Sequence, residues 1–133
     1  MGLDWLPDKE CFLILKKLTE DVVLKNNIPK VVLFENKILT EVITESESLK
    51  DFLAKNPTLA ERMKIKKQVQ DFTSRLHDLG YVHGDIKAKN ILLNEKGEIY
   101  FIDWDYLNFQ TPASIVREEK TLQVVLDLFN NKE

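Results

Sequence analysis

The segment YVHGDIKAKNILLNEKGEIYFIDWDY, residues 81–106, concentrates polar residues between runs of Ile, Leu, Phe and Tyr. Asn90 and Asp103 carry hard oxygen atoms, which suit Mg²⁺ held against a polyphosphate. Asp85 precedes Asn90 by five residues, and a carboxylate there can orient a hydroxyl group and accept its proton during phosphoryl transfer. Lys87 can neutralise charge on the moving phosphate. These residue types therefore predict a phosphoryl-transfer site.

A long helix is predicted immediately before this segment. Thr58 and Glu61 form a capping box at its start, and Gly80 is the expected cap at its end. Apolar residues at helical spacing predict its buried face: Ile65, Val69, Phe72, Leu76 and Leu79. The loop 83–90 therefore begins at the end of a well-defined helix.

A hairpin is predicted after the loop. Two β-rich runs within residues 90–103 flank a turn at 94–97, where Gly97 supplies the positive φ of a bulged hairpin. When this hairpin folds back, Asp103 lies beside Asn90. The two oxygen ligands then face one cation from opposite strands.

The remaining elements follow from the same kinds of pattern. Helical spacing of Cys11, Leu15, Leu18 and Val22 predicts a helix over about 7–24. Short strands are expected at 31–34 and 38–43, and a short helix at 48–55. The tail is expected to be helical from about 114 to 129, with Glu118 and Glu119 in its first turn facing the helix dipole. Its predicted buried residues are Val116, Leu122, Val125, Leu126 and Phe129.

Length and composition restrict the class of protein. The 133 residues, 44% of them hydrophobic, suit one α+β domain, and the net charge of −3 argues against nucleic acid as a partner. Cys11 is the only cysteine, which fits a reducing, cytoplasmic location. The N-terminal residues lack an export signal, and no run approaches the ~18 apolar residues of a membrane span.

The motifs resemble the protein-kinase-like superfamily. HGDIKAKN is similar to the catalytic loop, written there as His-x-Asp-x-Lys-x-x-Asn, and IDWD stands where the metal-binding Asp-Phe-Gly lies. Asp103 follows Asp85 by 18 residues, which is the hairpin length that kinases use. Gly84 in place of arginine and Asp105 in place of glycine look most like the lipopolysaccharide (Kdo) kinases and RIO-like kinases.

The resemblance implies a role for each site residue. Asp85 would be the catalytic base, Lys87 the phosphate contact, and Asn90 and Asp103 the Mg²⁺ ligands, with ATP as co-substrate. Glu41 and Val42 would lie at the adenine-binding hinge. His83 would brace the loop, and Trp104 is expected to pack against the first helix.

The resemblance also implies a lobe organisation. The chain would be one kinase-like domain, 1–133, with a remnant small lobe and hinge at about 7–43 and a large lobe at about 44–133. The first three strands of the small lobe have no sequence to occupy. The phosphate acceptor is left open as a hydroxyl of a protein or a small molecule.

The sequence departs from the kinase pattern in two ways, which leave alternatives to an active kinase open. The four glycines do not cluster into a lid over the nucleotide, and Glu10 lacks a lysine partner on a preceding strand. Losing one charged contact costs about 10²- to 10³-fold in rate, against a total enzymatic acceleration of ~10⁶-fold or more. A slow kinase is therefore possible. The alternatives are a pseudokinase, whose open strand edge at 31–42 binds a protein partner, and a reading frame that begins further upstream.

Overall fold

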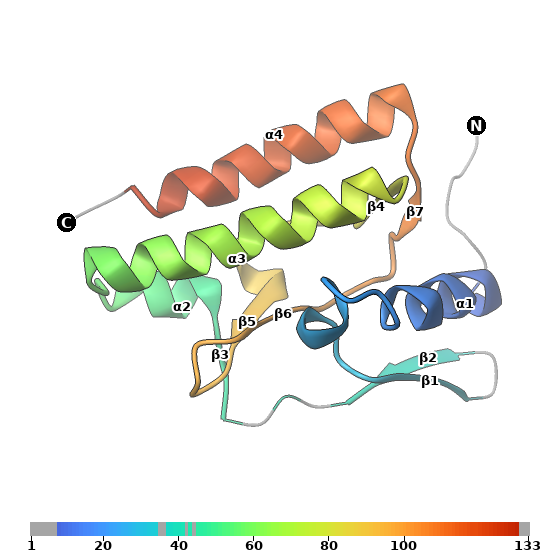
Figure 1. The fold of residues 1–133 in the computed structure, drawn as a ribbon, viewed down its shortest axis with the longest axis horizontal. Coiled ribbons are helices and arrows are strands. Elements are labelled where there is room, and N and C mark those ends of the chain that lie inside the picture. The colour runs from blue at the N-terminus through green and yellow to red at the C-terminus, as the bar shows by residue number, and fades with distance from the viewer. Residues whose placement is uncertain (1–7, 35–36, 42, 44, 131–133) are drawn as a thin grey trace.

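The computed structural model describes residues 8–34, 37–41, 43 and 45–130 (Figure 1). The chain forms helices and short antiparallel strands, which agrees with the predicted α+β class and is compatible with a kinase-like fold. In chain order the elements are α1 (Asp8–Leu18), the 3₁₀ turn η1 (Lys25–Asn27), β1 (Val31–Phe34), β2 (Lys37–Thr40), β3 (Glu47–Ser48), α2 (Leu49–Ala54), α3 (Leu59–Asp78), β4 (Tyr81–Val82), the 3₁₀ turn η2 (Ala88–Asn90), β5 (Ile91–Leu93), β6 (Ile99–Phe101), β7 (Asn108–Phe109) and α4 (Pro112–Leu128).

The strands form three small antiparallel sheets. They pair as β1 with β2, as β3 with β5 and β6, and as β4 with β7. Figure 1 shows α4 running beside α3 in the opposite direction, while α3 lies between α4 and the strands β5 and β6. The helix α1 packs on the β1–β2 hairpin at the other side of the molecule. The loop 83–90 therefore lies where α3, the β5–β6 hairpin and α4 meet.

The helix α3 begins as predicted. Thr58 Oγ1 accepts the Glu61 N–H, and the Glu61 carboxylate accepts the Thr58 N–H, so the capping box is complete. Four of the five predicted core residues are buried: Ile65, Val69, Phe72 and Leu76. The prediction for Leu79 was wrong, because it caps the helix and is 38% exposed. Gly80 follows it with a φ of +93°, as expected of a glycine that ends a helix.

The first helix is shorter than the pattern predicted. It ends at Leu18, and Val22, predicted to be buried, is 73% exposed. Asp21 explains the early end, because its carboxylate accepts the N–H groups of Val23 and Leu24 in a turn and is bound by Arg75 of α3 at 2.8 Å. The hydrogen bond from Arg75 is the main reason that the pKa of Asp21 is lowered.

The hairpin that carries the site residues is confirmed. The strands β5 and β6 pair in register from Ile91 with Phe101 to Leu93 with Ile99, and Gly97 in the turn has a φ of +79°. The Phe101 ring stacks on Phe72 of α3, with ring centroids 4.1 Å apart. This contact fixes the hairpin on the long helix.

The tail helix begins slightly earlier than predicted. Thr111 and Ser114 form a capping box around Pro112, so α4 spans Pro112–Leu128. Val125, Leu126 and Phe129 are buried as predicted and Leu122 is partly buried, but Val116 is 51% exposed, so that prediction was wrong. Near the hinge, β2 ends at Thr40 rather than at 43, and Val42 lies outside the described residues.

Candidate phosphoryl-transfer site

The loop brings three of the predicted residues into direct contact. Asn90 Nδ2 donates to the Asp85 main-chain oxygen at 2.9 Å and to Asp85 Oδ2 at 3.1 Å. Lys87 Nζ lies 3.7 Å from the same Oδ2 atom. The turn η2, closed by the Asn90 N–H on the Lys87 oxygen, makes this approach possible. Since the amide nitrogen of Asn90 is bound to Asp85, its amide oxygen is the end that can accept.

Asp103 is linked to this cluster through the backbone. The Ile102 N–H donates to the Asn90 main-chain oxygen at 2.9 Å, directly after the last β5–β6 pair. The next residue, Asp103, leaves the strand with a φ of +62°. Aspartate tolerates this left-handed conformation better than most residues do. Asp103 thus directly follows the residue that is hydrogen-bonded to the main chain of Asn90.

His83 braces the loop against the strand that precedes Asp103. Its side chain is fully buried, and its Nδ1 atom accepts the Asp85 N–H at 3.1 Å. Its other nitrogen, Nε2, therefore carries the proton and donates to the Ile102 oxygen at 2.9 Å. Burial lowers the pKa of His83, although the acidic groups around it act in the opposite direction. The ring is neutral at pH 7 and joins the two predicted motifs.

The contact of Glu118 with the loop is one that the sequence analysis missed. Its side chain is buried and accepts the His83 N–H at 2.9 Å, the Gly84 N–H at 2.8 Å and a bond from His77 Nε2 at 2.7 Å. Burial raises its pKa, but the hydrogen bonds from His77, Gly84 and His83 outweigh this effect and lower it. Glu118 therefore anchors the main chain of the loop as a carboxylate.

The sequence contained a sign of this role. Glu118 stands four residues before Leu122 and seven before Val125, so it falls on the buried face predicted for the tail helix. A carboxylate on an apolar face needs hydrogen-bond donors around it. The prediction that Glu118 faces the helix dipole in the first turn was wrong, because α4 begins at Pro112.

The segment that follows IDWD packs so closely on the loop that position 84 must be a glycine. Its φ is +95°, and a Cβ atom there would lie 2.4 Å from the Tyr106 main-chain oxygen. No side chain fits between the loop and this segment. Kinases of the ordinary pattern have arginine at this position. Here Gly84 allows the main chain at Tyr106 to lie directly against the loop.

Trp104 is a buried packing residue, as predicted, in the core cluster that contains Cys11 and Leu15 of α1. Its indole lies against His83, with ring centroids 4.5 Å apart, and against Phe72 of α3 at 6.0 Å. Its Nε1 atom donates to the Phe101 oxygen. Its main-chain oxygen contacts α1, where it accepts a bond from Cys11 Sγ at 3.4 Å. The indole therefore supports His83 from within the core.

The predicted hinge residue Glu41 contacts the β1–β2 hairpin. Its N–H donates to the Lys30 oxygen at 2.9 Å, and its carboxylate accepts the Lys30 N–H at 2.8 Å. Among the described residues, none of its hydrogen bonds reaches the loop 83–90. Since Val42 lies outside the described part of the chain, the hinge assignment stays a prediction.

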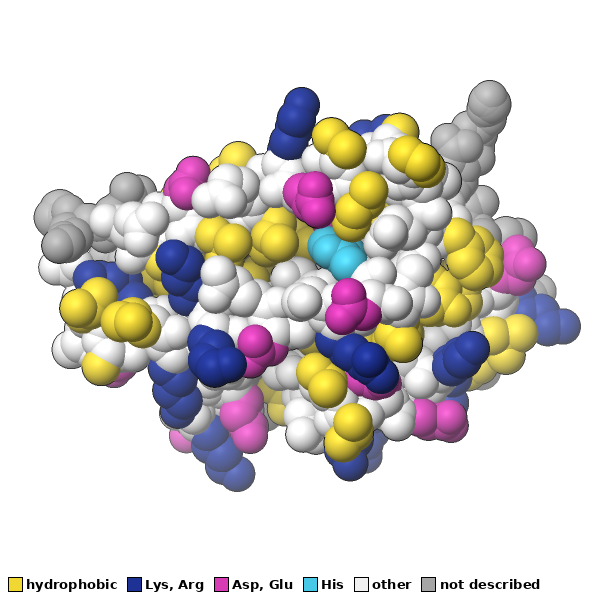
Figure 2. All heavy atoms as spheres, turned by 45° about the horizontal axis from the view of Figure 1, so that its top comes forward, with side chains coloured by type: hydrophobic (Ala, Val, Ile, Leu, Met, Phe, Trp, Pro, Cys, Tyr) yellow, Lys and Arg dark blue, Asp and Glu magenta, His cyan; other side chains and the backbone are white. Residues whose placement is uncertain are grey.

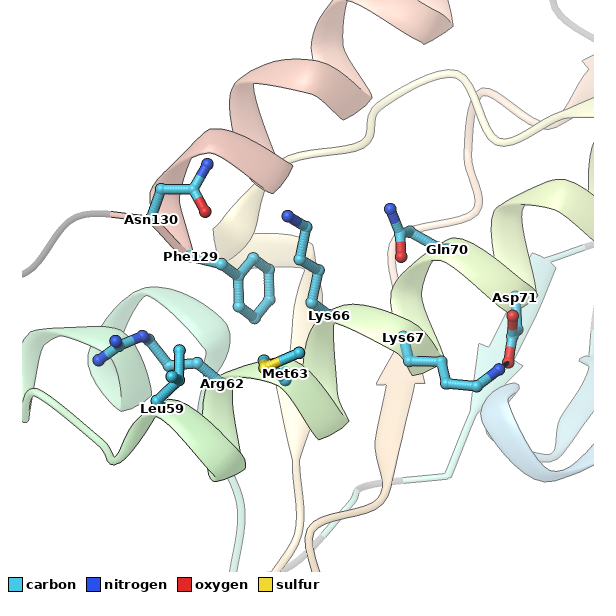
Figure 3. Close-up of a pocket in the computed structure, with 9 residues that line it drawn as sticks. All are labelled: Leu59, Arg62, Met63, Lys66, Lys67, Gln70, Asp71, Phe129 and Asn130. Carbon is cyan, nitrogen blue, oxygen red and sulfur yellow. Dashed lines mark hydrogen bonds and ion pairs between the residues drawn. The ribbon is translucent and has the colours of Figure 1, made fainter.

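Two cavities are relevant to binding. One, of about 570 Å³, is lined by Val82, Gly84, the segment 106–111 and the start of α4, so it borders the residue before Asp85. The other, of about 620 Å³, lies between the first half of α3 and the end of α4 (Figure 3). None of its lining residues belongs to the segment 83–103. We therefore assign the first cavity to the site, although the second is larger.

Asn90 and Asp103 offer two oxygen donors for Mg²⁺ rather than a complete set of protein ligands. The described residues contain no cluster of three or more His, Cys, Asp or Glu side chains that could hold a metal. Asn90 and Asp103 supply an amide oxygen and a carboxylate, and Mg²⁺ commonly takes one or two protein ligands and completes its shell with phosphate oxygens and water. The site therefore suits a cation that arrives with a nucleotide.

Comparison with known proteins identifies the family. Residues 23–126 match the model of the lipopolysaccharide kinase (Kdo/WaaP) family, and this stretch includes the loop, the hairpin and most of α4. The chain belongs to this family. The match confirms the resemblance that was inferred from HGDIKAKN and IDWD.

Three relatives place the family within the protein-kinase-like superfamily. The chain is 39% identical over 85 residues to the KEOPS complex subunit Bud32 of Pyrococcus abyssi, covering 62% of this chain and 38% of Bud32. It is 36% identical over 56 residues to the RIO-type serine/threonine-protein kinase Rio2 of Methanocaldococcus jannaschii, covering 42% and 19%. It is 34% identical over 61 residues to the 3-deoxy-D-manno-octulosonic acid kinase of Xylella fastidiosa, covering 46% and 24%. The chain thus spans less than two thirds of each relative's length.

The surface carries charges of both signs. In Figure 2 acidic and basic side chains are interspersed among apolar ones on the face that is shown, without a large field of one sign. This agrees with the small net charge of −3. In the part of the chain that the structure describes, no helix is long and apolar enough to cross a lipid bilayer.

Proposed function

We propose that this chain is an atypical kinase-like phosphotransferase that moves the γ-phosphate of ATP to a hydroxyl acceptor with Mg²⁺. The observation that carries the proposal is the hydrogen-bonded unit in which Asn90 binds Asp85 and accepts the Ile102 N–H. This unit joins the proposed base Asp85 to the proposed cation ligand Asn90, and Asp103 follows Ile102 in the chain. The kinase names of the relatives support the same activity.

The chemistry assigns one task to each residue. Asp85 accepts the proton of the acceptor hydroxyl while the hydroxyl oxygen forms a bond to the γ-phosphorus of ATP. The bond between this phosphorus and the β,γ-bridging oxygen breaks, and ADP leaves with the electron pair. Lys87, next to Asp85, neutralises the transferring phosphoryl group. Bound Mg²⁺ supplies further charge neutralisation on the phosphates.

The acceptor would enter the cavity beside Gly84. This cavity has a volume of about 570 Å³, which lies within the ~300–1,000 Å³ of small-molecule sites. Tyr106 and Phe109, both partly exposed, offer apolar surface there. Among the described residues that line it, Arg117 alone is charged. The lining includes Gly84, which directly precedes Asp85 and whose N–H is held by Glu118.

The lobe organisation is part of the same proposal. Residues 1–133 would form one kinase-like domain in which about 7–43 are a reduced small lobe and about 44–133 the large lobe. Glu41 and Val42 would meet the adenine at the hinge. The pairing of β1 with β2 alone among the described strands supports a reduced small lobe.

Nucleotide binding and transfer test the proposal separately. Isothermal titration should show ATP binding that strengthens with Mg²⁺, and Asp103→Asn should remove this Mg²⁺ dependence. Asp85→Asn should retain ATP binding but lower transfer from labelled ATP by about 10²- to 10⁴-fold. The matched control is Asp127→Asn on the exposed side of α4, which should behave as wild type. Transfer that is unaffected by both site substitutions would refute the assignment.

A binding module of kinase fold is the second candidate. Val32 and Leu39 face each other across the β1–β2 hairpin and are 55% and 48% exposed, so an apolar strand pair is open to a partner chain. Glu10 and Lys9 are exposed on α1, so Glu10 lies at the surface. Sedimentation and pull-down from the native host test this candidate. A strict monomer that turns over ATP unaided would argue against it.

A further inference from the structure

The cavity between α3 and α4 has an excess of unpaired positive charge. Among the described residues that line it, three are basic, Arg62, Lys66 and Lys67, and one is acidic, Asp71. Asp71 already pairs with Lys67 at 2.9 Å. Figure 3 shows this pair on one side, while Lys66 rises from α3 beside the Phe129 ring. Among the described residues Lys66 makes no ion pair.

Arg62 gives independent support for an anionic ligand. Its side chain is only 8% exposed, and Nη1 donates to the Pro57 oxygen at 2.7 Å. Its Nε atom is buried without a hydrogen-bond partner among the described residues. A buried guanidinium N–H is usually satisfied, because leaving it unpaired costs free energy. A carboxylate bound in the cavity that Arg62 lines would balance the charge of this guanidinium group.

The same cavity also offers apolar surface. Leu59 and Met63 are 63% and 62% exposed at its edge, and the Phe129 ring forms part of its wall. The volume of about 620 Å³ admits one or two side chains of a bound chain. A simple inorganic anion would use the basic groups but not this apolar edge.

We propose that the α3–α4 cavity binds an acidic segment of a partner protein, with carboxylates on Arg62 and Lys66 and an apolar side chain against Met63 and Phe129. The site is separate from the phosphoryl-transfer site, because its lining excludes the segment 83–103. Its occupation therefore does not depend on the proposed activity. The segment recruits a partner or substrate protein to the face formed by the two long helices.

Three synthetic hexapeptides with blocked ends test the binding directly. The first has two leucines flanked by pairs of glutamates, the second replaces the glutamates by glutamines, and the third replaces the leucines by serines. Binding is followed by amide chemical shifts of ¹⁵N-labelled protein. The first peptide should shift signals of residues 59–71 and 129–130. Each of the other two peptides should bind at least about tenfold more weakly, since each lacks one of the two contacts.

Matched charge reversals locate the site. Lys66→Glu should weaken binding of the first peptide by at least about tenfold. Lys64→Glu makes the same change in net charge on an exposed position of α3 outside this cavity, and it should stay within about twofold of wild type. Equal weakening by both variants would reduce the effect to general electrostatics and overturn the proposal. Absence of binding at millimolar peptide, equal binding of the glutamine peptide, or Lys66-dependent self-association seen in sedimentation would also overturn it.

Discussion

Replacing Glu118 by glutamine removes one carboxylate oxygen from a place where three donors converge. Oε1 accepts the Gly84 N–H at 2.8 Å, and Oε2 accepts the His83 N–H at 2.9 Å and a bond from His77 at 2.7 Å. A glutamine has only one oxygen. In either orientation its NH₂ group therefore faces one main-chain N–H of the loop, which is left buried without an acceptor.

The magnitude follows from these contacts. An unsatisfied buried donor costs about 1–3 kcal/mol, and converting the other charge-assisted bond into a neutral one costs about 1 kcal/mol. We expect Glu118→Gln to lower the free energy of unfolding by about 2–4 kcal/mol. With an m value of ~2 kcal/mol/M, the urea midpoint should fall by about 1–2 M. Hydrogen exchange should show faster exchange of the His83 and Gly84 amides.

The neighbouring residue supplies the control. Glu119 is exposed on the same helix turn, so Glu119→Gln should change the free energy of unfolding by at most about 0.5 kcal/mol. Equal stability of the two variants, with unchanged amide protection at 83 and 84, would refute the role given to Glu118. A loss of stability without faster exchange at these amides would locate the effect elsewhere in α4.

Three further predictions concern packing and pH. Gly84→Ala should lower the free energy of unfolding by about 2 kcal/mol or more, from the positive φ and the clash with the Tyr106 backbone; a urea midpoint equal to wild type would contradict this. Phe72→Ala should cost about 3–5 kcal/mol because it removes the ring stacked on Phe101, and a loss below ~1 kcal/mol would show that the core collapses around it. Burial lowers the pKa of His83 in the folded protein, so the unfolded chain binds more protons than the folded one once the pH falls below the ordinary value of about 6.5. The contribution of His83 to stability is therefore complete above that pH and is lost as the pH decreases toward the folded-state pKa. Urea midpoints at pH 7.5, 6 and 5 check this, and a midpoint that rises in acid would disprove it.

Local patterns predicted much of the fold. The capping box of α3 and the β5–β6 turn at Gly97 depend on residues within a few positions of each other, so their sequence spacing is sufficient. The contacts of Asp85 with Lys87 and Asn90 also lie within one loop. The family resemblance rested on the same short segments. These features could be predicted because the chain between the interacting groups is short.

The sequence by itself determined the local elements and the chemical types of the site residues. Only the tertiary structure decided where α1 ends, because Asp21 meets Arg75 across 54 positions of the chain. It also decided that Glu118 anchors the loop, through bonds that span 34 and 35 positions. Such contacts form when distant elements pack together, and helical spacing cannot show which donors will surround a buried carboxylate.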